Sequence, residues 1–171
     1  MDELVGVPVP PLRLTATSGH GVDLTGVGDP WGVLYLYPMT AQPGVDLPAD
    51  WDEIPGARGC TPEACGFRDR HDDFSGLGAE VYGISAQAPE WQREAVERLG
   101  LPFGLLSDPD LLLGEALGLP TFTADGMTLY ERLTLVVRPA RVVKVFHPVP
   151  SPSEHAGEVA RWLREEGDEV A

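Results

Sequence analysis

The sequence predicts an α/β fold in which a mixed central sheet is flanked by helices in three layers. Short apolar runs typical of strands alternate with amphipathic stretches typical of helices along most of the chain. Near the C-terminus, the apolar runs 132–137 and 142–146 are separated only by residues 138–141, which predicts a hairpin. A length of 171 residues fits a single domain spanning 1–171 with its own hydrophobic core.

The first predicted elements lead to a long connection. Residues 5–25 form an edge strand or hairpin around the turn at 18–21, because an alternating stretch precedes a glycine-rich segment. The apolar run 32–37, closed by Pro38, predicts a buried central strand. Residues 39–59 then form a connection of a length usually found in functional lids or in inserted loops.

A helix is predicted immediately after this connection. From Thr61 onward, apolar side chains recur at spacings of three and four until Gly76 and Gly78 end the helix. Thr61 and Pro62 suit the start of a helix, and the carboxylate of Glu63 suits the positive end of its dipole. Cys60 is therefore placed at the N-terminus of this helix.

The rest of the chain continues the alternation. The remaining predicted elements are a strand at 79–85, a helix at 89–99, a short strand at 103–106, a helix at 109–117, the hairpin, and a closing amphipathic helix at 154–166. Val159, Trp162 and Leu163 form the inward side of the closing helix. Trp91 and Phe122 are expected in the core, and His71 is expected to be a half-buried histidine with its polar atoms satisfied.

Composition excludes several classes of partner. The formal charge is −15, from 27 acidic and 12 basic residues, which disfavours binding to nucleic acid or to anionic membranes. No run of 18 apolar residues is present, and the N-terminus has no basic region before an apolar stretch, so a cytoplasmic location is expected. The four histidines have no paired spacing, so neither a zinc site nor any other cofactor is expected.

Cys60 and Cys65 carry all the thiol chemistry of the chain. Spacing alone leaves two interpretations open: a reactive pair, or two buried thiols that never meet. The position of Cys60 favours reactivity, because unpaired backbone N–H groups and the helix dipole stabilise a thiolate. We therefore expect a lowered pKa for Cys60, with Arg58 nearby and a second arginine approaching from the sheet.

The five-residue spacing predicts a conformational switch. In a continuous helix, such residues lie roughly 8–9 Å apart at Cα and about 140° apart around the axis. A disulfide requires Cα atoms within about 7 Å of each other. Cys60 and Cys65 therefore cannot bond to each other while both remain helical, and oxidation must unwind the first turn.

The segment from Gly59 to Asp69, GCTPEACGFRD, resembles the active-site signature of the peroxiredoxin Q group, also called bacterioferritin comigratory proteins. The resemblance extends to Tyr37-Pro38, and to the stretches 83–85, 105–110 and 132–137 in matching order. It implies a thioredoxin-like fold and an AhpC/TSA-like peroxidase that reduces hydrogen peroxide and organic hydroperoxides. Electrons would come from thioredoxin or a similar dithiol protein, and the chain would be a monomer or a homodimer.

The resemblance also implies roles for particular residues. Cys60 matches the peroxidatic cysteine, which becomes a sulfenic acid, and Cys65 matches the cysteine that resolves it as an intramolecular disulfide. Arg132 matches the active-site arginine that stabilises the thiolate and the developing charge; its alternative interpretation is a surface ion pair with Glu131 or Asp125. Pro38 matches the proline that shields the nucleophile.

One departure from the family pattern concerns the hydroxyl that holds the peroxide. The family pattern is Pro-x-x-x-Thr-x-x-Cys, whereas position 57 is Ala here and Pro38 stands 22 residues before Cys60. An inserted loop at about 41–57, containing Trp51, accounts for the difference and is either a lid or docking surface or a tolerated loop. Thr40 and the backbone N–H groups of the helix entrance are the candidate replacements for the missing hydroxyl.

Two other functions use the same cysteine pair. A redox sensor or interaction protein would undergo the switch without efficient turnover, and the missing threonine favours this alternative. A disulfide oxidoreductase of thioredoxin type is disfavoured, because the chain has no C-x-x-C motif.

Overall fold

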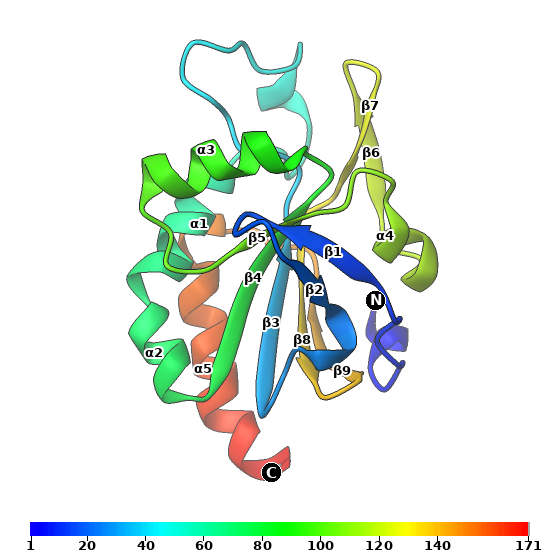
Figure 1. Ribbon diagram of the computed structural model, residues 1–171, viewed down its shortest axis with the longest axis vertical. Helices are drawn as coiled ribbons and strands as arrows, with labels where there is room; N and C mark the ends of the chain where they lie inside the picture. Colours follow the sequence, from blue (N-terminus) through cyan, green and yellow to red (C-terminus); the bar gives the residue numbers. More distant parts are fainter. Residues whose placement is uncertain (171) are drawn as a thin grey trace.

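The computed structural model describes residues 1–170, with side chains to residue 166, and is built on one seven-stranded sheet (Figure 1). The strand order is β2-β1-β5-β4-β3-β8-β9. The strands are β1 (Arg13–Ala16), β2 (Gly21–Asp23), β3 (Trp31–Leu36), β4 (Ala79–Ser85), β5 (Leu105–Ser107), β8 (Leu133–Arg138) and β9 (Arg141–Phe146). β3, β4 and β5 are parallel, and the other pairs are antiparallel, so the predicted mixed sheet is confirmed.

Helices and the N-terminal segment cover the two faces of the sheet. The helices are α1 (Cys60–Asp69), α2 (His71–Gly76), α3 (Pro89–Leu99), α4 (Leu112–Leu117) and α5 (Pro152–Val170). Side chains of α1, α2, α3 and α5 pack with Val33 and Tyr35 of β3 on one face. The N-terminal segment and α4 pack with Leu34 and Leu36 on the other face. Both faces of β3 are therefore buried, as its apolar run predicts.

The helix predicted from Thr61 to Gly76 is interrupted. Arg70 has φ −105° and ψ 14°, and it separates α1 from α2. α1 packs along α5, whereas α2 packs on β4, so the two segments serve different neighbours. The prediction of one continuous helix is wrong because periodicity reports a buried face and not the direction of the axis.

The helix predicted at 109–117 starts later than expected. Asp108 accepts hydrogen bonds from the backbone N–H groups of Leu112 (2.9 Å) and Leu113 (3.1 Å). Leu111 is in the left-handed region with φ 55°, so the helix begins only at Leu112. The carboxylate of Asp108 thus caps the helix although Asp108 lies four residues before its first residue, a separation that the sequence pattern does not reveal.

A two-stranded hairpin that was not predicted from the sequence is formed by β6 (Thr121–Ala124) and β7 (Met127–Tyr130). Its turn is Asp125-Gly126, with φ values of 52° and 76°, and an Asp-Gly pair is a strong signal for such a turn. The hairpin projects from the main sheet beside the 41–57 segment (Figure 1).

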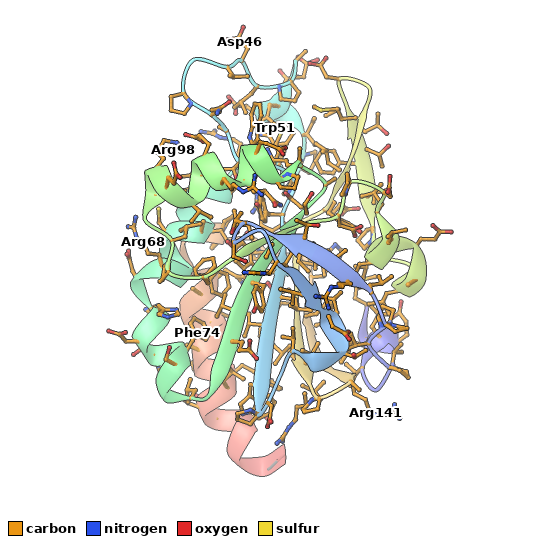
Figure 2. All side chains as sticks on the ribbon, in the orientation of Figure 1. Asp46, Trp51, Arg68, Phe74, Arg98 and Arg141 are labelled. Carbon is orange, nitrogen blue, oxygen red and sulfur yellow. The ribbon has the colours of Figure 1, made fainter. Side chains whose placement is uncertain are left out.

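The 41–57 segment contains one short 3-10 helix, Trp51–Glu53. Asp46 lies at its exposed outer end, whereas Trp51 points inward and is 6% exposed (Figure 2). Trp51 and Phe122 of β6 have ring centroids 6.1 Å apart. The segment is thus attached to the body of the protein through its tryptophan.

The predictions for three aromatic residues and one histidine have mixed outcomes. Trp91, Trp162 and Phe122 are half-buried and not fully in the core. His71 is half-buried as expected, but its Nδ1 atom is buried without a hydrogen-bond partner, so the expectation that its polar atoms are satisfied is wrong. None of the helices within residues 1–170 is long and apolar enough to cross a membrane.

Candidate active site

Cys60 is the first residue of α1, as predicted, and Gly59 sets its position. Gly59 has φ 107°, which side-chain-bearing residues rarely adopt, and a Cβ there would lie 2.7 Å from Pro152 of α5. The chain therefore turns sharply between the 41–57 segment and α1, close against α5. This turn directs the thiol of Cys60 toward the interior, where it is 8% exposed.

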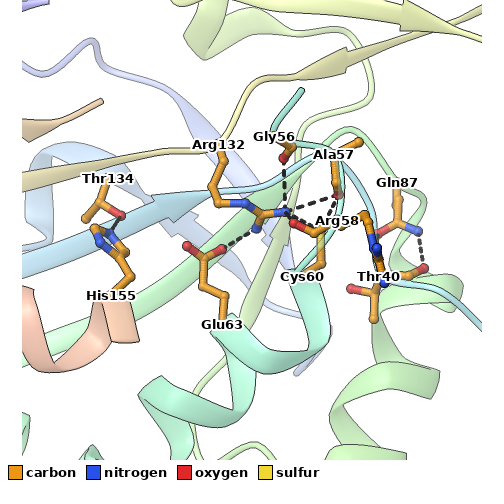
Figure 3. A network of polar contacts seen from close by, with 10 residues as sticks. All are labelled: Thr40, Gly56, Ala57, Arg58, Cys60, Glu63, Gln87, Arg132, Thr134 and His155. Carbon is orange, nitrogen blue, oxygen red and sulfur yellow. Dashed lines mark hydrogen bonds and ion pairs between the residues drawn. The ribbon is translucent and has the colours of Figure 1, made fainter. Parts of the chain in front are cut away.

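Arg132, immediately before β8, meets Cys60 at this point (Figure 3). Its Nη2 donates a hydrogen bond to Cys60 Sγ at 3.2 Å, and its Nη1 donates to Glu63 Oε1 at 2.7 Å. The side chains of Arg132 and Glu63 are 2% and 0% exposed. The interpretation of Arg132 as a surface ion pair with Glu131 or Asp125 is therefore wrong.

Backbone carbonyls hold the same guanidinium. Nη2 of Arg132 also donates to the carbonyl oxygens of Gly56 (3.4 Å), Ala57 (3.2 Å) and Arg58 (3.0 Å). The last residues of the connection thus fix the arginine from one side, while Glu63 fixes it from the other (Figure 3). These contacts hold the guanidinium against the sulfur.

Arg58 contributes its carbonyl to this network and not its charge. Its side chain is 73% exposed and forms an ion pair with Asp52 at 3.3 Å. The expectation that Arg58 would supply positive charge to Cys60 is therefore not met by its position, and the arginine from the sheet takes that place.

Opposing effects act on the Cys60 thiol. Burial raises its pKa, the charge and hydrogen bond of Arg132 lower it, and the carboxylate of Glu63 raises it again. The net direction is upward, so the lowered pKa expected from the helix N-terminus is wrong for this conformation. The reason is that the helix start is buried, and Glu63 shares the arginine charge with the sulfur.

Glu63, expected only to suit the positive end of the helix dipole, is part of the network. Burial raises its pKa to about 7, and Arg132 opposes this rise. Cys60 and Glu63 are three residues apart in the first turn of a helix, so their side chains share one side. That spacing is the signal by which the sequence could have identified Glu63 as the arginine's partner.

Cys65 lies in α1 with Cys60, and both thiols are free. Cys60 is buried and Cys65 is half-buried. The structure thus holds both cysteines in one helix, which is the arrangement in which the spacing forbids a disulfide between them.

Pro38 and Thr40 follow β3 at the edge of the site. Pro38 is buried. Thr40 is 3% exposed, and the backbone around it is fixed by side chains: its N–H donates to Gln87, and its carbonyl accepts from Gln87 and Trp91. The roles of Pro38 and Thr40 toward the peroxide stay predictions.

A second buried network ties α5 to β8 behind the site. His155 Nε2 lies 2.7 Å from Thr134 Oγ1, and His155 Nδ1 lies 3.1 Å from Glu158 Oε1 (Figure 3 shows the first pair). Burial lowers the pKa of His155, while Glu158 raises it. His155 therefore joins the helix packed on α1 to the strand that follows Arg132.

The chain segment before Cys60 lines two hollows. One, of about 190 Å³, is lined by Cys60 together with Met39, Leu47 and Trp51. A larger groove of about 820 Å³ is lined by Arg132 and His147 but not by Cys60. The smaller cavity is thus the one that gives access to the thiol.

Among the side chains of residues 1–166, no cluster of three or more His, Cys, Asp or Glu groups could hold a metal ion. The site is instead a buried thiol, a guanidinium and a carboxylate at the start of a helix. With a mixed sheet flanked by helices, this arrangement is typical of thiol-based redox proteins, and here an arginine contacts the cysteine sulfur.

Comparisons with known proteins show which family of thiol-based redox proteins this chain resembles. Residues 54–146 match the AhpC/TSA family. Peroxiredoxin Bcp of Bacillus subtilis is 29% identical over 94% of this chain and 95% of its own length. The chloroplastic peroxiredoxin Q of Sedum lineare is 32% identical over 93% of this chain and 77% of its own length. The crystal structure of peroxidoxin BcpB from Mycobacterium tuberculosis superposes with a TM-score of 0.74 at 26% identity, covering 94% of this chain and 96% of that one.

The chain belongs to the AhpC/TSA family, and its relatives place it in the peroxiredoxin Q and Bcp group of thiol-dependent peroxidases. The predictions of a thioredoxin-like fold and of a peroxiredoxin are confirmed. The comparisons favour a peroxidase over the redox sensor considered from the sequence.

Proposed function

We propose that this chain reduces hydroperoxides with Cys60 as the nucleophile and Arg132 as the group that stabilises the reacting charge. The contact of 3.2 Å between Arg132 Nη2 and Cys60 Sγ, inside a buried site, carries the proposal. The thiolate attacks the nearer peroxide oxygen, an S–O bond forms, and the O–O bond breaks. The cysteine becomes a sulfenic acid, and the leaving oxygen takes up a proton and departs as water or alcohol.

Arg132 can act on both charges in this reaction. A guanidinium has several N–H donors in a fixed plane, so one group can contact the sulfur and the leaving oxygen in succession. Glu63 and the carbonyls before Cys60 hold the guanidinium in place before the peroxide arrives. Preorganised donors of this kind stabilise developing charge without having to reorient during the reaction.

Cys65 resolves the sulfenic acid in the next step. Its thiol attacks Cys60 Sγ, a disulfide forms, and the sulfenic hydroxyl leaves as water. Because both cysteines start within α1, the first turn of that helix must unwind before the sulfurs meet. Gly59 supports this step, since a glycine with positive φ immediately before Cys60 supplies a flexible hinge.

A dithiol protein such as thioredoxin then reduces the disulfide and returns both thiols. The peroxiredoxin relatives support this class of partner. We infer a cytoplasmic location and a monomer or homodimer. We also infer no role for nucleic acid or membranes, in keeping with the charge of −15.

The backbone N–H groups at the start of α1 and the hydroxyl of Thr40 remain the candidates for holding the peroxide. Met39 and Ala41 line the cavity beside Cys60, and Thr40 lies between them in the chain. Pro38, buried at the end of β3, is proposed to shield the thiol from water.

The test compares wild type with Cys60→Ser and Cys65→Ser in peroxide consumption supported by thioredoxin and its reductase. Cys60→Ser abolishes consumption. Cys65→Ser consumes one equivalent and then stalls with a sulfenic acid on Cys60, which dimedone labelling and mass spectrometry detect. Full activity of Cys60→Ser, or unimpaired turnover of Cys65→Ser, would show that the assignment is wrong.

A further inference from the structure

The cavity beside Cys60 is larger than hydrogen peroxide requires. Its volume is about 190 Å³. A water molecule takes up about 30 Å³ in the liquid, so the cavity holds the equivalent of about six waters, whereas hydrogen peroxide contains two oxygen atoms. Space therefore remains next to the sulfur for a group attached to the peroxide.

The 41–57 segment contributes apolar side chains to the wall of this remaining space, together with the charged Asp52. Leu47 and Trp51 line the cavity from this segment, and Met39 adds to the same lining. The charged side chains at the cavity, Asp52 and Arg58, are exposed and pair with each other at 3.3 Å. The cavity thus offers apolar contact and no unpaired charge to an entering molecule, which suits a neutral organic group.

The position of Trp51 is fixed from outside the segment. Its ring packs at 6.1 Å from Phe122 of β6, and it clusters with Ala57, Ala124 and Leu129. Trp51 is 6% exposed, so this packing holds it in place where it lines the same cavity as Cys60. Leu47, 41% exposed, lies at the open side of the same cavity.

We propose that Leu47 and Trp51 are specificity-determining residues that hold the organic group of a neutral alkyl or aryl hydroperoxide while Cys60 attacks its peroxide oxygen. This inference rests on the proposed peroxidase function and assigns a role to the segment that departs from the family pattern. Hydrogen peroxide makes no use of this wall, so the wall raises the rate with organic hydroperoxides relative to hydrogen peroxide. Phe122 is a positioning residue that acts through Trp51.

The experiment measures second-order rate constants for loss of the Cys60 thiol, by quenched flow and mass spectrometry, with cumene hydroperoxide and with hydrogen peroxide. The variants are Leu47→Ser and Trp51→Ala, and Val45→Ser is the matched control. Val45 lies in the same segment and is 47% exposed, but it does not line the cavity. Phe122→Ala tests the positioning role.

Loss of one apolar contact in a pocket changes discrimination by about tenfold or more. We expect the ratio of the cumene hydroperoxide rate to the hydrogen peroxide rate to fall about tenfold in Leu47→Ser and further in Trp51→Ala. The hydrogen peroxide rate should stay within about threefold of wild type, and Val45→Ser should keep the wild-type ratio. Phe122→Ala should lower the ratio in the same direction as Trp51→Ala.

An unchanged ratio in Leu47→Ser overturns the proposal, and so does an equal fall in Val45→Ser or a parallel loss of both rates in the cavity variants. If Trp51→Ala fails to fold, Leu47→Ser decides alone, because its exposed side chain adds little to stability. Failure of the peroxidase function itself is a separate result: wild type would then react with both peroxides no faster than a free thiolate.

Discussion

Replacing Arg132 with methionine tests the central contact of the site. The substitution removes the hydrogen bond to Cys60 Sγ at 3.2 Å and the positive charge, while keeping a long apolar side chain in the buried position. A unit charge about 4 Å from a thiolate contributes about 4 kcal/mol at an effective dielectric of 20. Glu63 shares this charge at 2.7 Å, so the net effect on the sulfur is smaller.

A hydrogen bond to a charged group contributes about 1.5 to 3 kcal/mol, and we take about 2 to 3 kcal/mol as the net loss. This corresponds to a factor of about 30 to 150 in the rate constant for the reaction of Cys60 with peroxide. Because the arginine lowers the pKa of the thiol, its removal also shifts the pH profile of that rate to higher pH.

Stopped-flow measurement of the peroxide reaction from pH 5 to pH 10 provides the assay. Arg58→Met is the matched control, since Arg58 is two residues from Cys60 but its side chain is exposed and pairs with Asp52. It should leave both rate and profile unchanged. Arg132→Lys keeps the charge but loses the planar fork, so its rate should lie between those of wild type and Arg132→Met.

Leaving Glu63 without its partner destabilises the fold, so thermal melts accompany each measurement. The double variant Arg132→Met/Glu63→Gln removes the unpaired carboxylate and should regain stability without regaining the rate. A rate for Arg132→Met within threefold of wild type would refute the reasoning. An equal loss in Arg58→Met would also refute it.

Three further predictions concern stability. Glu63 has a pKa raised from 4.5 to about 7, so its contribution to folding is present below pH 4.5 and is lost as the pH rises through 7. Calorimetry should therefore show that wild type loses stability relative to Glu63→Gln between pH 5 and pH 8. A constant difference in stability between the two proteins would contradict this prediction. The ring of Phe67 is fully buried and stacks on Tyr35 with ring centroids 4.6 Å apart. Phe67→Ala should lower the free energy of unfolding, measured in urea, by about 3 to 5 kcal/mol. A decrease of less than about 1 kcal/mol would mean that the core is packed differently. Tyr130→Phe removes the hydroxyl that donates a hydrogen bond to Asp108 at 2.6 Å. It should lower the free energy of unfolding in urea by about 1 to 3 kcal/mol. An unchanged free energy would show that this hydrogen bond is not formed.

The sheet and most of its helices followed from local patterns. The apolar run at 32–37 could be buried only as a strand with both faces covered, and β3 has that environment. The position of Cys60 also followed from local signals, since Thr61 and Pro62 suit a helix start and the helix begins one residue earlier.

The elements that were missed or misplaced depend on contacts with residues far away in the sequence, which a local pattern of apolar residues does not include. α1 and α2 separate at Arg70 because one follows α5 and the other β4, and periodicity is the same in both. The hairpin of β6 and β7 carried the Asp125-Gly126 turn signal, but its strands are short and partly exposed, so their apolar pattern is weak.

The sequence by itself determined the chemistry that is local: a thiol at a helix start, a second thiol in the same helix, and a spacing that requires unwinding before the two can bond. The family resemblance pointed to Arg132, but only the tertiary structure shows that its side chain meets the sulfur, 72 residues away in the chain, while Arg58, two residues from Cys60, points to solvent. The tertiary structure also decided the pKa of Cys60, since burial and Glu63 act against the helix N-terminus. The physical reason is that charge and desolvation act through space, over distances that are fixed only when the chain has folded.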